Sequence, residues 1–452
     1  MPEVLVAAAR DAIPIRAIGP NGIGALAGTS AAWAAATGFQ ARAGSVALVP
    51  EGSGGIGEVL FGLGDGGDSM LSGRLPAILP PATYRLADGF PAPRLAALAF
   101  ALGAYRFTRY RKDESPQPRL VIPEGVDAAG LTATVDAVTL VRDLVNTGAN
   151  DLGPAELAEA AAGLARRHGA DIAVTSGETL AERFPLIHAV GAAAVAERAP
   201  RLIDLTWGLP SAPKVTIVGK GVCFDTGGLD IKPSSGMVLM KKDMGGAANA
   251  LGLAHMVMAA GLPVRLRVLI PAVENAIAGA AFRPGDVLRS RKGISVEIGN
   301  TDAEGRLILA DALSLAAEES PELLFDLATL TGAARVALGP EIVPFYTHRD
   351  ALAAALTRHG EAEADPLWRL PLWAPYAKFL DSTLADINNA GSAPFAGSIT
   401  AALFLARFVP REVAWVHADI YAWNPSSRPA HPEGGEAQAI RAIFGLLAEK
   451  YA

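Results

Sequence analysis

Residues 218–233 read VGKGVCFDTGGLDIKP and begin with the last two residues of the β-branched run Lys214–Gly219. Such a run predicts a buried strand, and the glycines and charged residues that follow predict a loop at its carboxyl end. In sheets that alternate with helices, loops at the carboxyl ends of strands form the functional sites. We therefore expect an α/β fold in which Lys220 and Asp225 lie at the site-bearing edge of the sheet.

Strand and helix patterns alternate along the chain after residue 150. Buried apolar strands that alternate with helices are typical of a mixed, mainly parallel sheet covered by helices. The pattern predicts strands at residues 172–175, 214–219, 264–270, 294–298, 323–327, 342–346 and 413–420. It predicts helices at residues 154–167, 236–260, 305–317, 351–359, 398–407 and 435–450.

The first 125 residues show short apolar runs, such as 45–49 and 119–122, between glycine-rich clusters. This pattern predicts a small N-terminal α/β domain, and the clusters are interpreted as turns because no Gly-Lys-Ser/Thr follows them. Residues 129–145 have helical apolar spacing. We therefore expect an N-terminal domain (1–125), a connecting helix (126–149) and a larger C-terminal α/β domain (150–452).

Charge and cysteine content exclude several classes of protein. The 452 residues carry a formal net charge of -7, so a nucleic-acid partner is not expected, and basic clusters at 106–112 and 289–292 are interpreted as solvated surface. Apolar runs such as 95–104 are shorter than the ~20 residues of a membrane span, and the N-terminus lacks a signal-peptide pattern. The single cysteine, Cys223, excludes an intrachain disulfide and is interpreted as a buried hydrophobe. We expect a soluble cytoplasmic protein with no membrane partner.

A second stretch, residues 300–307 (NTDAEGRL), places two carboxylates and a guanidinium just ahead of an apolar helical pattern. Alone, it fits a helix N-terminus in which Thr301 or Asp302 caps free backbone amides. Capping does not explain residues 218–233, nor the MKKDMGG run at 240–246. The three stretches together therefore indicate a chemical site.

Carboxylates are the candidate metal ligands, because the chain contains neither a His-Glu-x-x-His nor a Cys-x-x-Cys motif. Several carboxylates that crowd one site repel one another unless divalent cations compensate their charge. Two ions about 3.5–4 Å apart, bridged by carboxylates and a hydroxide, would absorb that charge. The candidates are Asp225, Asp243, Asp302 and Glu304.

These stretches resemble the leucine (cytosol) aminopeptidase family, whose members use two metal ions to remove N-terminal residues from peptides. The resemblance begins near residue 140 and includes NTGAN at 146–150, ATLTG at 328–332 and the strand that contains His417 to Asp419. It implies that residues 150–452 form a catalytic metallopeptidase domain. Position by position, it implies the metal ligands Lys220, Asp225, Asp243, Asp302 and Glu304, and the catalytic residues Lys232 and Arg306, which are not ligands.

The resemblance implies hydrolysis of the N-terminal residue from unblocked peptides by a hydroxide that bridges two divalent ions, zinc or manganese. Lys220 would bind metal as a neutral amine, because an ammonium has no lone pair. Lys232 would stabilise the oxyanion, and a bicarbonate near Arg306 would act as the base. Family members are hexamers, so the expected partners are peptides with a free N-terminus and five further copies of this chain.

The resemblance places the pocket for the first side chain at Met240, Thr329, Gly332, Tyr421 and Asn424. If Tyr421 and Asn424 line that pocket, leucine should bind less well than in the family's namesake, because a phenol and an amide replace an apolar wall. Alternatively, both residues end a buried strand and face away from that pocket. The neighbouring Lys241 and Lys242 are interpreted as helix-surface charges.

Two other functions are compatible with parts of the pattern. Carboxylate clusters also hold metals in two-metal phosphoesterases, although a lysine ligand is unexpected there. A catalytically idle DNA-binding or scaffolding relative should lose one of the seven motif residues or gain a basic face, and this sequence does neither.

Overall fold

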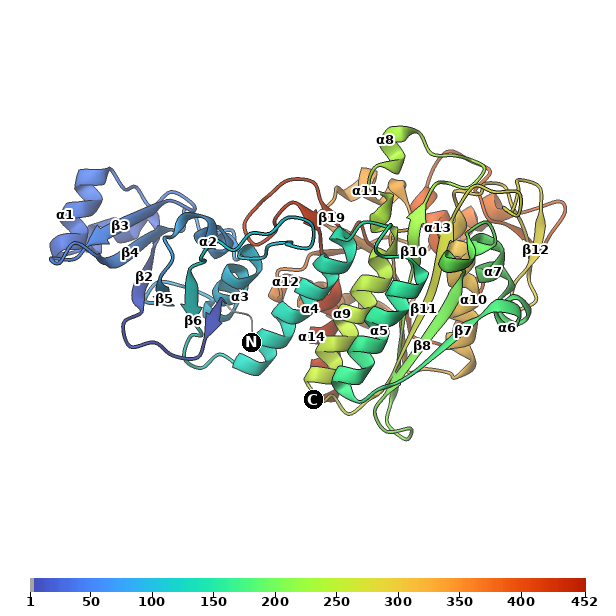
Figure 1. Ribbon diagram of the computed structural model, residues 1–452, viewed down its shortest axis with the longest axis horizontal. Helices are drawn as coiled ribbons and strands as arrows, with labels where there is room; N and C mark the ends of the chain where they lie inside the picture. The colour runs from blue at the N-terminus through green and yellow to red at the C-terminus, as the bar shows by residue number, and fades with distance from the viewer. Residues whose placement is uncertain (1–3) are drawn as a thin grey trace. The chain divides into compact units, whose positions relative to one another are not determined.

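The computed structural model describes residues 4–452, which divide into two compact units (Figure 1). The first unit comprises Met1–Thr139 with Asn424–Glu433, and the second comprises Leu140–Trp423 with Gly434–Ala452. Helix α4 (Ala128–Asn146) runs across the point where the chain passes from one unit to the other. The boundaries expected from the sequence, 125 and 150, lie just outside the two ends of this helix.

The first unit contains a six-stranded mixed sheet in the order β1-β6-β5-β2-β4-β3. Every neighbouring pair is parallel except the β3–β4 hairpin. This confirms a small α/β domain, and the glycine-rich clusters form turns as predicted. The elements are β1 (Leu5–Val6), β2 (Ile13–Ile18), α1 (Gly28–Thr37), β3 (Val46–Pro50), β4 (Ile56–Gly62), α2 (Leu75–Ile78), β5 (Thr83–Leu86), α3 (Pro93–Gly103) and β6 (Arg119–Val121).

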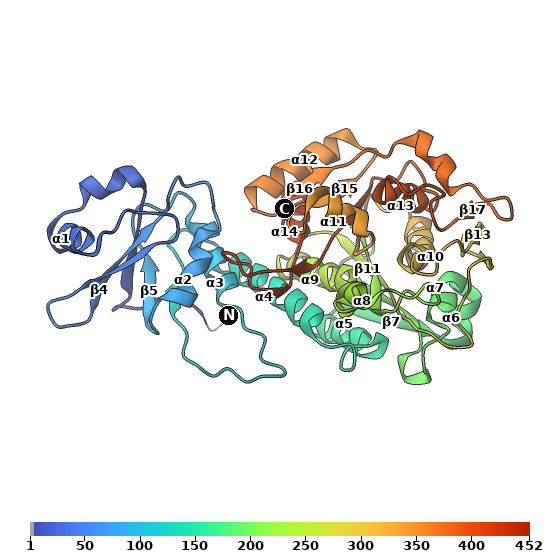
Figure 2. The same cartoon turned by 90° about the horizontal axis from the view of Figure 1, so that it is seen from above.

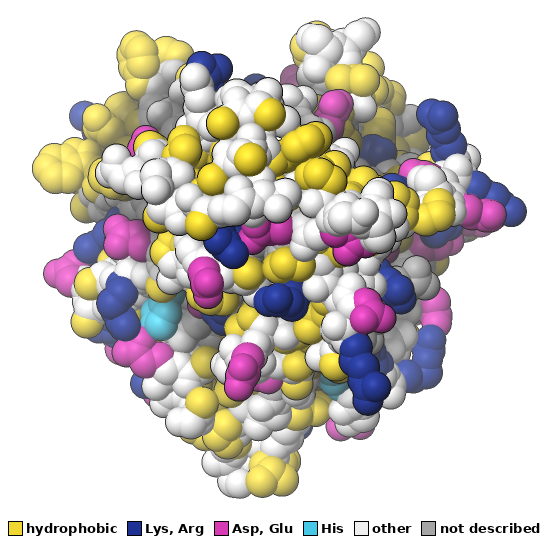
Figure 3. Space-filling view, turned by 90° about the vertical axis from the view of Figure 1, so that its left-hand side faces the viewer, with side chains coloured by type: hydrophobic (Ala, Val, Ile, Leu, Met, Phe, Trp, Pro, Cys, Tyr) yellow, Lys and Arg dark blue, Asp and Glu magenta, His cyan; other side chains and the backbone are white. Residues whose placement is uncertain are grey.

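Basic and acidic side chains are interspersed on the face of the first unit that Figure 3 shows. No large area of one sign is visible on this face, so it lacks the basic stripe that typifies nucleic-acid binding.

The second unit contains a nine-stranded mixed sheet in the order β16-β15-β18-β14-β9-β11-β8-β7, with β10 also paired to β11. The central pairs are parallel, and antiparallel pairs occur between β15 and β18, β11 and β8, and β8 and β7. The mainly parallel sheet is therefore confirmed. Its strands are β7 (Asp171–Ser176), β8 (Arg201–Trp207), β9 (Lys214–Gly219), β10 (Gly221–Asp225), β11 (Arg265–Asn275), β14 (Leu323–Ala328), β15 (Val343–Tyr346), β16 (Leu367–Arg369) and β18 (Trp415–Asp419).

Helices cover both faces of this sheet, with α5 and α9 on one side and α6, α7 and α10 on the other (Figures 1 and 2). The core on the α10 side is continuous and aliphatic, and it includes Leu307, Ile308 and Phe404. These and the neighbouring helices are α5 (Pro154–His168), α6 (Gly177–Arg183), α7 (Pro185–Gly191), α9 (Gly245–Ala259), α10 (Glu304–Glu318), α11 (Gly332–Leu338), α12 (Asp350–Ala362), α13 (Gly397–Ala406) and α14 (Ile440–Tyr451). Short strands pair outside the large sheet: β12 (Val287–Arg289), β13 (Ser295–Glu297) and β17 (Ile387–Asn388) in one group, and β19 (Trp423–Asn424) with β20 (Gly434–Gly435) in another.

The prediction of one continuous helix over residues 236–260 is wrong. The structure divides this segment into α8 (Ser234–Met237), the 3-10 turn η4 (Met240–Met244) and α9. At the start of α9, a Cβ atom on Gly246 would lie 2.1 Å from the Leu327 carbonyl oxygen, so the chain needs glycine to enter the buried helix here. The interruption places the side chains of η4 beside the sheet edge.

Within residues 4–452, no helix combines the length and apolar character needed to cross a bilayer.

Candidate metal centre

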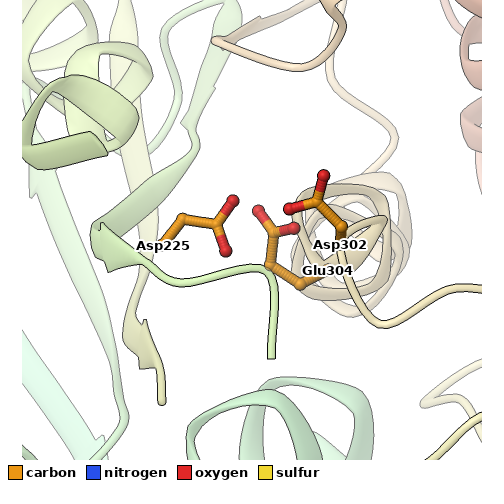
Figure 4. Close-up of side chains that lie close together, drawn as sticks. All are labelled: Asp225, Asp302 and Glu304. Carbon is orange, nitrogen blue, oxygen red and sulfur yellow. The ribbon is translucent and has the colours of Figure 1, made fainter. Parts of the chain in front are cut away.

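The predicted site residues meet in one cavity of about 420 Å³, at the carboxyl ends of β10 and β14 and the amino end of α10. Six of the seven residues assigned as ligands or catalytic groups line it: Lys220, Asp225, Lys232, Asp243, Asp302 and Glu304. The carboxylates of Asp225, Asp302 and Glu304 point toward one another (Figure 4), with ligand oxygens within 4.8 Å of each other. Residues distant in the sequence therefore form one acidic cluster.

Lys220 lies between β9 and β10, where its side chain is buried. Its ammonium is 2.8 Å from Asp243 Oδ2 and 2.9 Å from Glu304 Oε1, and it donates a hydrogen bond to the Thr329 carbonyl oxygen. Burial alone would lower the pKa of Lys220, but the Asp243 and Glu304 carboxylates outweigh burial and raise that pKa above its usual value. Without another cation, the lysine neutralises part of the cluster.

Lys232 supplies the second ammonium of the cavity. Its Nζ lies 2.9 Å from Asp225 Oδ2 and also contacts Asp302 Oδ1. Lys232 reaches this position because its backbone N–H donates to the Thr226 carbonyl oxygen across the glycine-rich turn. The ammonium therefore stands directly at the carboxylate pair, with 15% of its side chain exposed.

The cavity carries more negative charge than these two lysines neutralise. Four carboxylates contact only two ammoniums in these ion pairs. Burial and the neighbouring Asp225 raise the pKa of Glu304 well above its usual value, and burial with Asp243 raises the pKa of Asp225 to about 6. The oxygen donors and the crowding of carboxylates both fit divalent cations.

Arg306 lies on the first turn of α10 but does not line the cavity. Its Nη1 donates to the Asn389 carbonyl oxygen at 2.7 Å, while its buried Nε has no hydrogen-bond partner among residues 4–452. Burial lowers the pKa of Arg306 to about 10, so the guanidinium remains charged at neutral pH.

A layer of neutral and acidic groups holds the ligand loops, and sequence reasoning missed most of it. Asn275 donates to Asp225 Oδ1 at 2.9 Å and to the Thr301 carbonyl oxygen at 3.1 Å. Thr301 in turn donates to the Gly227 carbonyl oxygen, and the Asp230 carboxylate accepts the Thr301 N–H. Asn275 ends β11 beside β10, so its place at the carboxyl end of a strand was the available signal.

Four of the five residues expected around the first side chain line the same cavity: Met240, Thr329, Gly332 and Tyr421. Asn424 does not line it, and its amide donates to the carbonyl oxygens of His431 and Pro432.

The interpretation of Lys241 and Lys242 as helix-surface charges is wrong. Lys242 is only 5% exposed, lines the cavity and lies with its ammonium 4.5 Å from the centre of the Tyr421 ring. Burial lowers the pKa of Lys242 to about 8. Lys241 is partly buried and donates to the Asn146 carbonyl oxygen. Both differences arise because η4 packs against the segment that follows β18.

A carboxylate cluster at the carboxyl edge of a mainly parallel α/β sheet is compatible with the class of metal-dependent hydrolases. Comparison with known proteins gives the family. Residues 139–444 match the model of the cytosol aminopeptidase family catalytic domain, and residues 14–123 match that of the M17 aminopeptidase N-terminal domain. The chain belongs to the cytosol aminopeptidase family, and it is accordingly a metallo-exopeptidase, a hydrolase.

Individual relatives agree with this assignment. The chain is 42% identical over 369 residues to a probable cytosol aminopeptidase of Roseiflexus castenholzii, covering 76% of this chain and 74% of the relative. The crystal structure of a cytosol aminopeptidase from Coxiella burnetii superposes with a TM-score of 0.96 at 46% identity over 100% of both chains. The bottromycin maturation enzyme BotP in complex with Mn gives a TM-score of 0.88 at 36% identity, over 97% of this chain and 99% of BotP.

Proposed function

We propose that this aminopeptidase uses two divalent metal ions held by Lys220, Asp225, Asp243, Asp302 and Glu304. The observation that carries the proposal is the cluster of four carboxylates, which contact only two ammoniums. Zinc and manganese both suit such a donor set, and the BotP structure is a manganese complex. When bound, the two ions would polarise the scissile carbonyl, take the free α-amine and supply a bridging hydroxide near neutral pH.

Lys220 serves this site as a neutral amine. Its amine faces the carboxylate oxygens of Asp243 and Glu304, which the divalent cations would also contact. Divalent charge at the same oxygens disfavours the ammonium and leaves a nitrogen lone pair.

Lys232 stabilises the oxyanion that develops when the peptide carbonyl is attacked. Its side chain is mostly buried, so a negative oxygen beside it is poorly screened by water. Because the Thr226 contact fixes its backbone, the ammonium is oriented before the substrate binds.

Arg306 holds a small anion, bicarbonate, that acts as the general base. Among residues 4–452, no histidine lines the cavity, and the carboxylates there are the proposed ligands. The unpartnered Nε of Arg306 and the amino end of α10 both favour an anion.

The family resemblance further implies a homo-hexamer, for which light scattering should give the mass of six chains.

The test combines metal analysis with a peptide assay. Purified protein loaded with Mn or Zn should contain two equivalents of metal and release the first residue from unblocked peptides, whereas N-acetylated copies of the same peptides should be inert. Equal release from blocked and unblocked peptides would refute exopeptidase action. Faster turnover of a phosphodiester than of any peptide would favour the phosphoesterase alternative.

A further inference from the structure

Two cations lie on the cavity wall that is formed by Tyr421. Lys242 Nζ is 4.5 Å from the centre of the Tyr421 ring, and the Arg335 guanidinium is 5.2 Å from it. Arg335 also donates to the Tyr421 hydroxyl at 3.1 Å. The phenol is therefore held by two cations, and all three side chains line the cavity that contains the carboxylate cluster.

Within residues 4–452, neither cation forms an ion pair with a carboxylate, and the neighbouring Asp243 is paired with Lys220. The nearby carboxylate of Asp419 is already occupied, because it accepts hydrogen bonds from the backbone N–H groups of Leu330 and Thr331 and from the hydroxyls of Thr331 and Ser398. Lys242 is about 95% buried, so its ammonium reaches solvent only through the cavity that it lines. A buried cation without an anionic partner favours an anion that enters from the cavity.

We propose that Arg335 and Lys242 make this cavity selective for peptides whose first residue is Asp or Glu. The inference rests on the proposed function, because the cavity must hold the first residue and the carboxylate cluster must be neutralised by metal. The side-chain carboxylate of the substrate then lies beside Tyr421, where it can pair with both Arg335 and Lys242.

Glu and Gln substrates isolate the charge, since they have nearly the same shape. We expect the Mn-loaded wild type to cleave Glu-peptides with a kcat/KM at least about tenfold above that of Gln-peptides, the range for one charge-assisted contact. Peptides that begin with Leu, and matched peptides that begin with Asp or Asn, complete the substrate panel. Calorimetric binding of free glutamate and glutamine to the same holoenzyme gives a second readout that does not depend on turnover.

Arg335→Met is the first variant, because Arg335 is exposed and its loss should not disturb folding. It should lower the Glu/Gln ratio about tenfold, and Arg335→Lys should restore part of it. Lys242→Met should lower the ratio further. Lys378→Met is the matched control, since it removes an exposed positive charge that does not line the cavity, and its Glu/Gln ratio should equal that of the wild type.

The outcomes separate the two proposals. Efficient cleavage of unblocked peptides with a wild-type Glu/Gln ratio at or below one would overturn the acidic preference and leave the aminopeptidase mechanism standing. The acidic preference is equally overturned if Arg335→Met and Lys378→Met change the ratio by the same factor. If the enzyme cleaves no peptide but binds glutamate more tightly than glutamine, the proposed function is wrong and the cationic pocket stands. If it neither cleaves peptides nor prefers glutamate, both proposals are wrong.

Discussion

The Lys220 side chain lies directly against the Cα of Gly305. A Cβ atom at position 305 would lie 2.5 Å from Lys220 Cε and 2.6 Å from its Nζ. Gly305 follows Glu304 on the first turn of α10, so the helix that supplies one proposed ligand also leaves the space for another. Lys220 can therefore occupy this position only because residue 305 has no side chain.

Gly305→Ala should abolish activity while leaving the fold intact. The new methyl group must displace the Lys220 amine, whereas alanine in a helix is otherwise favoured over glycine by about 0.5–1 kcal/mol. Metal content and peptide release should fall together, with little change in Tm. Gly163→Ala on α5 is the control, because only the flexible Arg166 lies within 4 Å of its added Cβ. A fully active Gly305→Ala enzyme would show that Lys220 need not occupy this position.

Lys232→Ala should lower kcat and retain the metal. Loss of one oxyanion donor typically lowers kcat about 10²–10³-fold. Asp302→Ala or Glu304→Ala should instead lose activity through loss of metal, measured by elemental analysis after dialysis. If Lys232→Ala keeps the wild-type kcat, Lys232 does not stabilise the oxyanion.

The parts of the fold that follow one local pattern could be predicted from the sequence. The run Lys214–Gly219 contains four consecutive β-branched residues, 215–218, and it forms β9 with those bounds. Residues 129–145 show helical spacing and form the body of α4. Lys220 follows directly from β9, and for this reason the sequence could place it at the sheet edge. Residues 221–225, expected to form a loop, instead form β10, which Asp225 ends.

The environment of Lys242 could not be predicted in this way. Its burial depends on Tyr421, far along the chain, and on the interruption of the predicted helix at η4. The sequence predicts one helix over residues 236–260, and the separate turn η4 before α9, which begins beside Leu327, has no local signal in the sequence. The position of Asn424 likewise depends on hydrogen bonds to carbonyl groups in the loop that follows it.

Asn275→Ala should weaken metal binding without removing a ligand. Asn275 orients Asp225 and also holds the Thr301 carbonyl oxygen, so its loss frees both ligand loops. Loss of a residue that hydrogen-bonds to a metal ligand typically lowers metal affinity about 10–100-fold. Competition with a chelator measures the affinity, and activity should return when metal is added in excess. Unchanged affinity would mean that the backbone alone positions Asp225.

Asp311→Asn should change how stability depends on pH. Asp311 is buried on α10 and accepts the backbone N–H groups of Leu186, Ile187 and Arg291. These contacts favour the carboxylate, but burial is the larger effect and raises the pKa of Asp311 to about 7.

Because that pKa is higher in the folded than in the unfolded chain, the native state binds more protons between about pH 4 and pH 7. The contribution of Asp311 is therefore complete below pH 4 and declines as the pH rises to 7, by about 1.4 kcal/mol per pH unit at most. Asparagine does not titrate, so the difference in unfolding free energy between Asp311→Asn and the wild type should change across this window, as measured by urea titrations at each pH. Asp171→Asn, which alters an exposed carboxylate, is the control, and its unfolding free energy should show the same pH dependence as that of the wild type. If the unfolding free energy of Asp311→Asn has the same pH dependence as that of the wild type, the three backbone N–H groups outweigh burial and keep the carboxylate ionised.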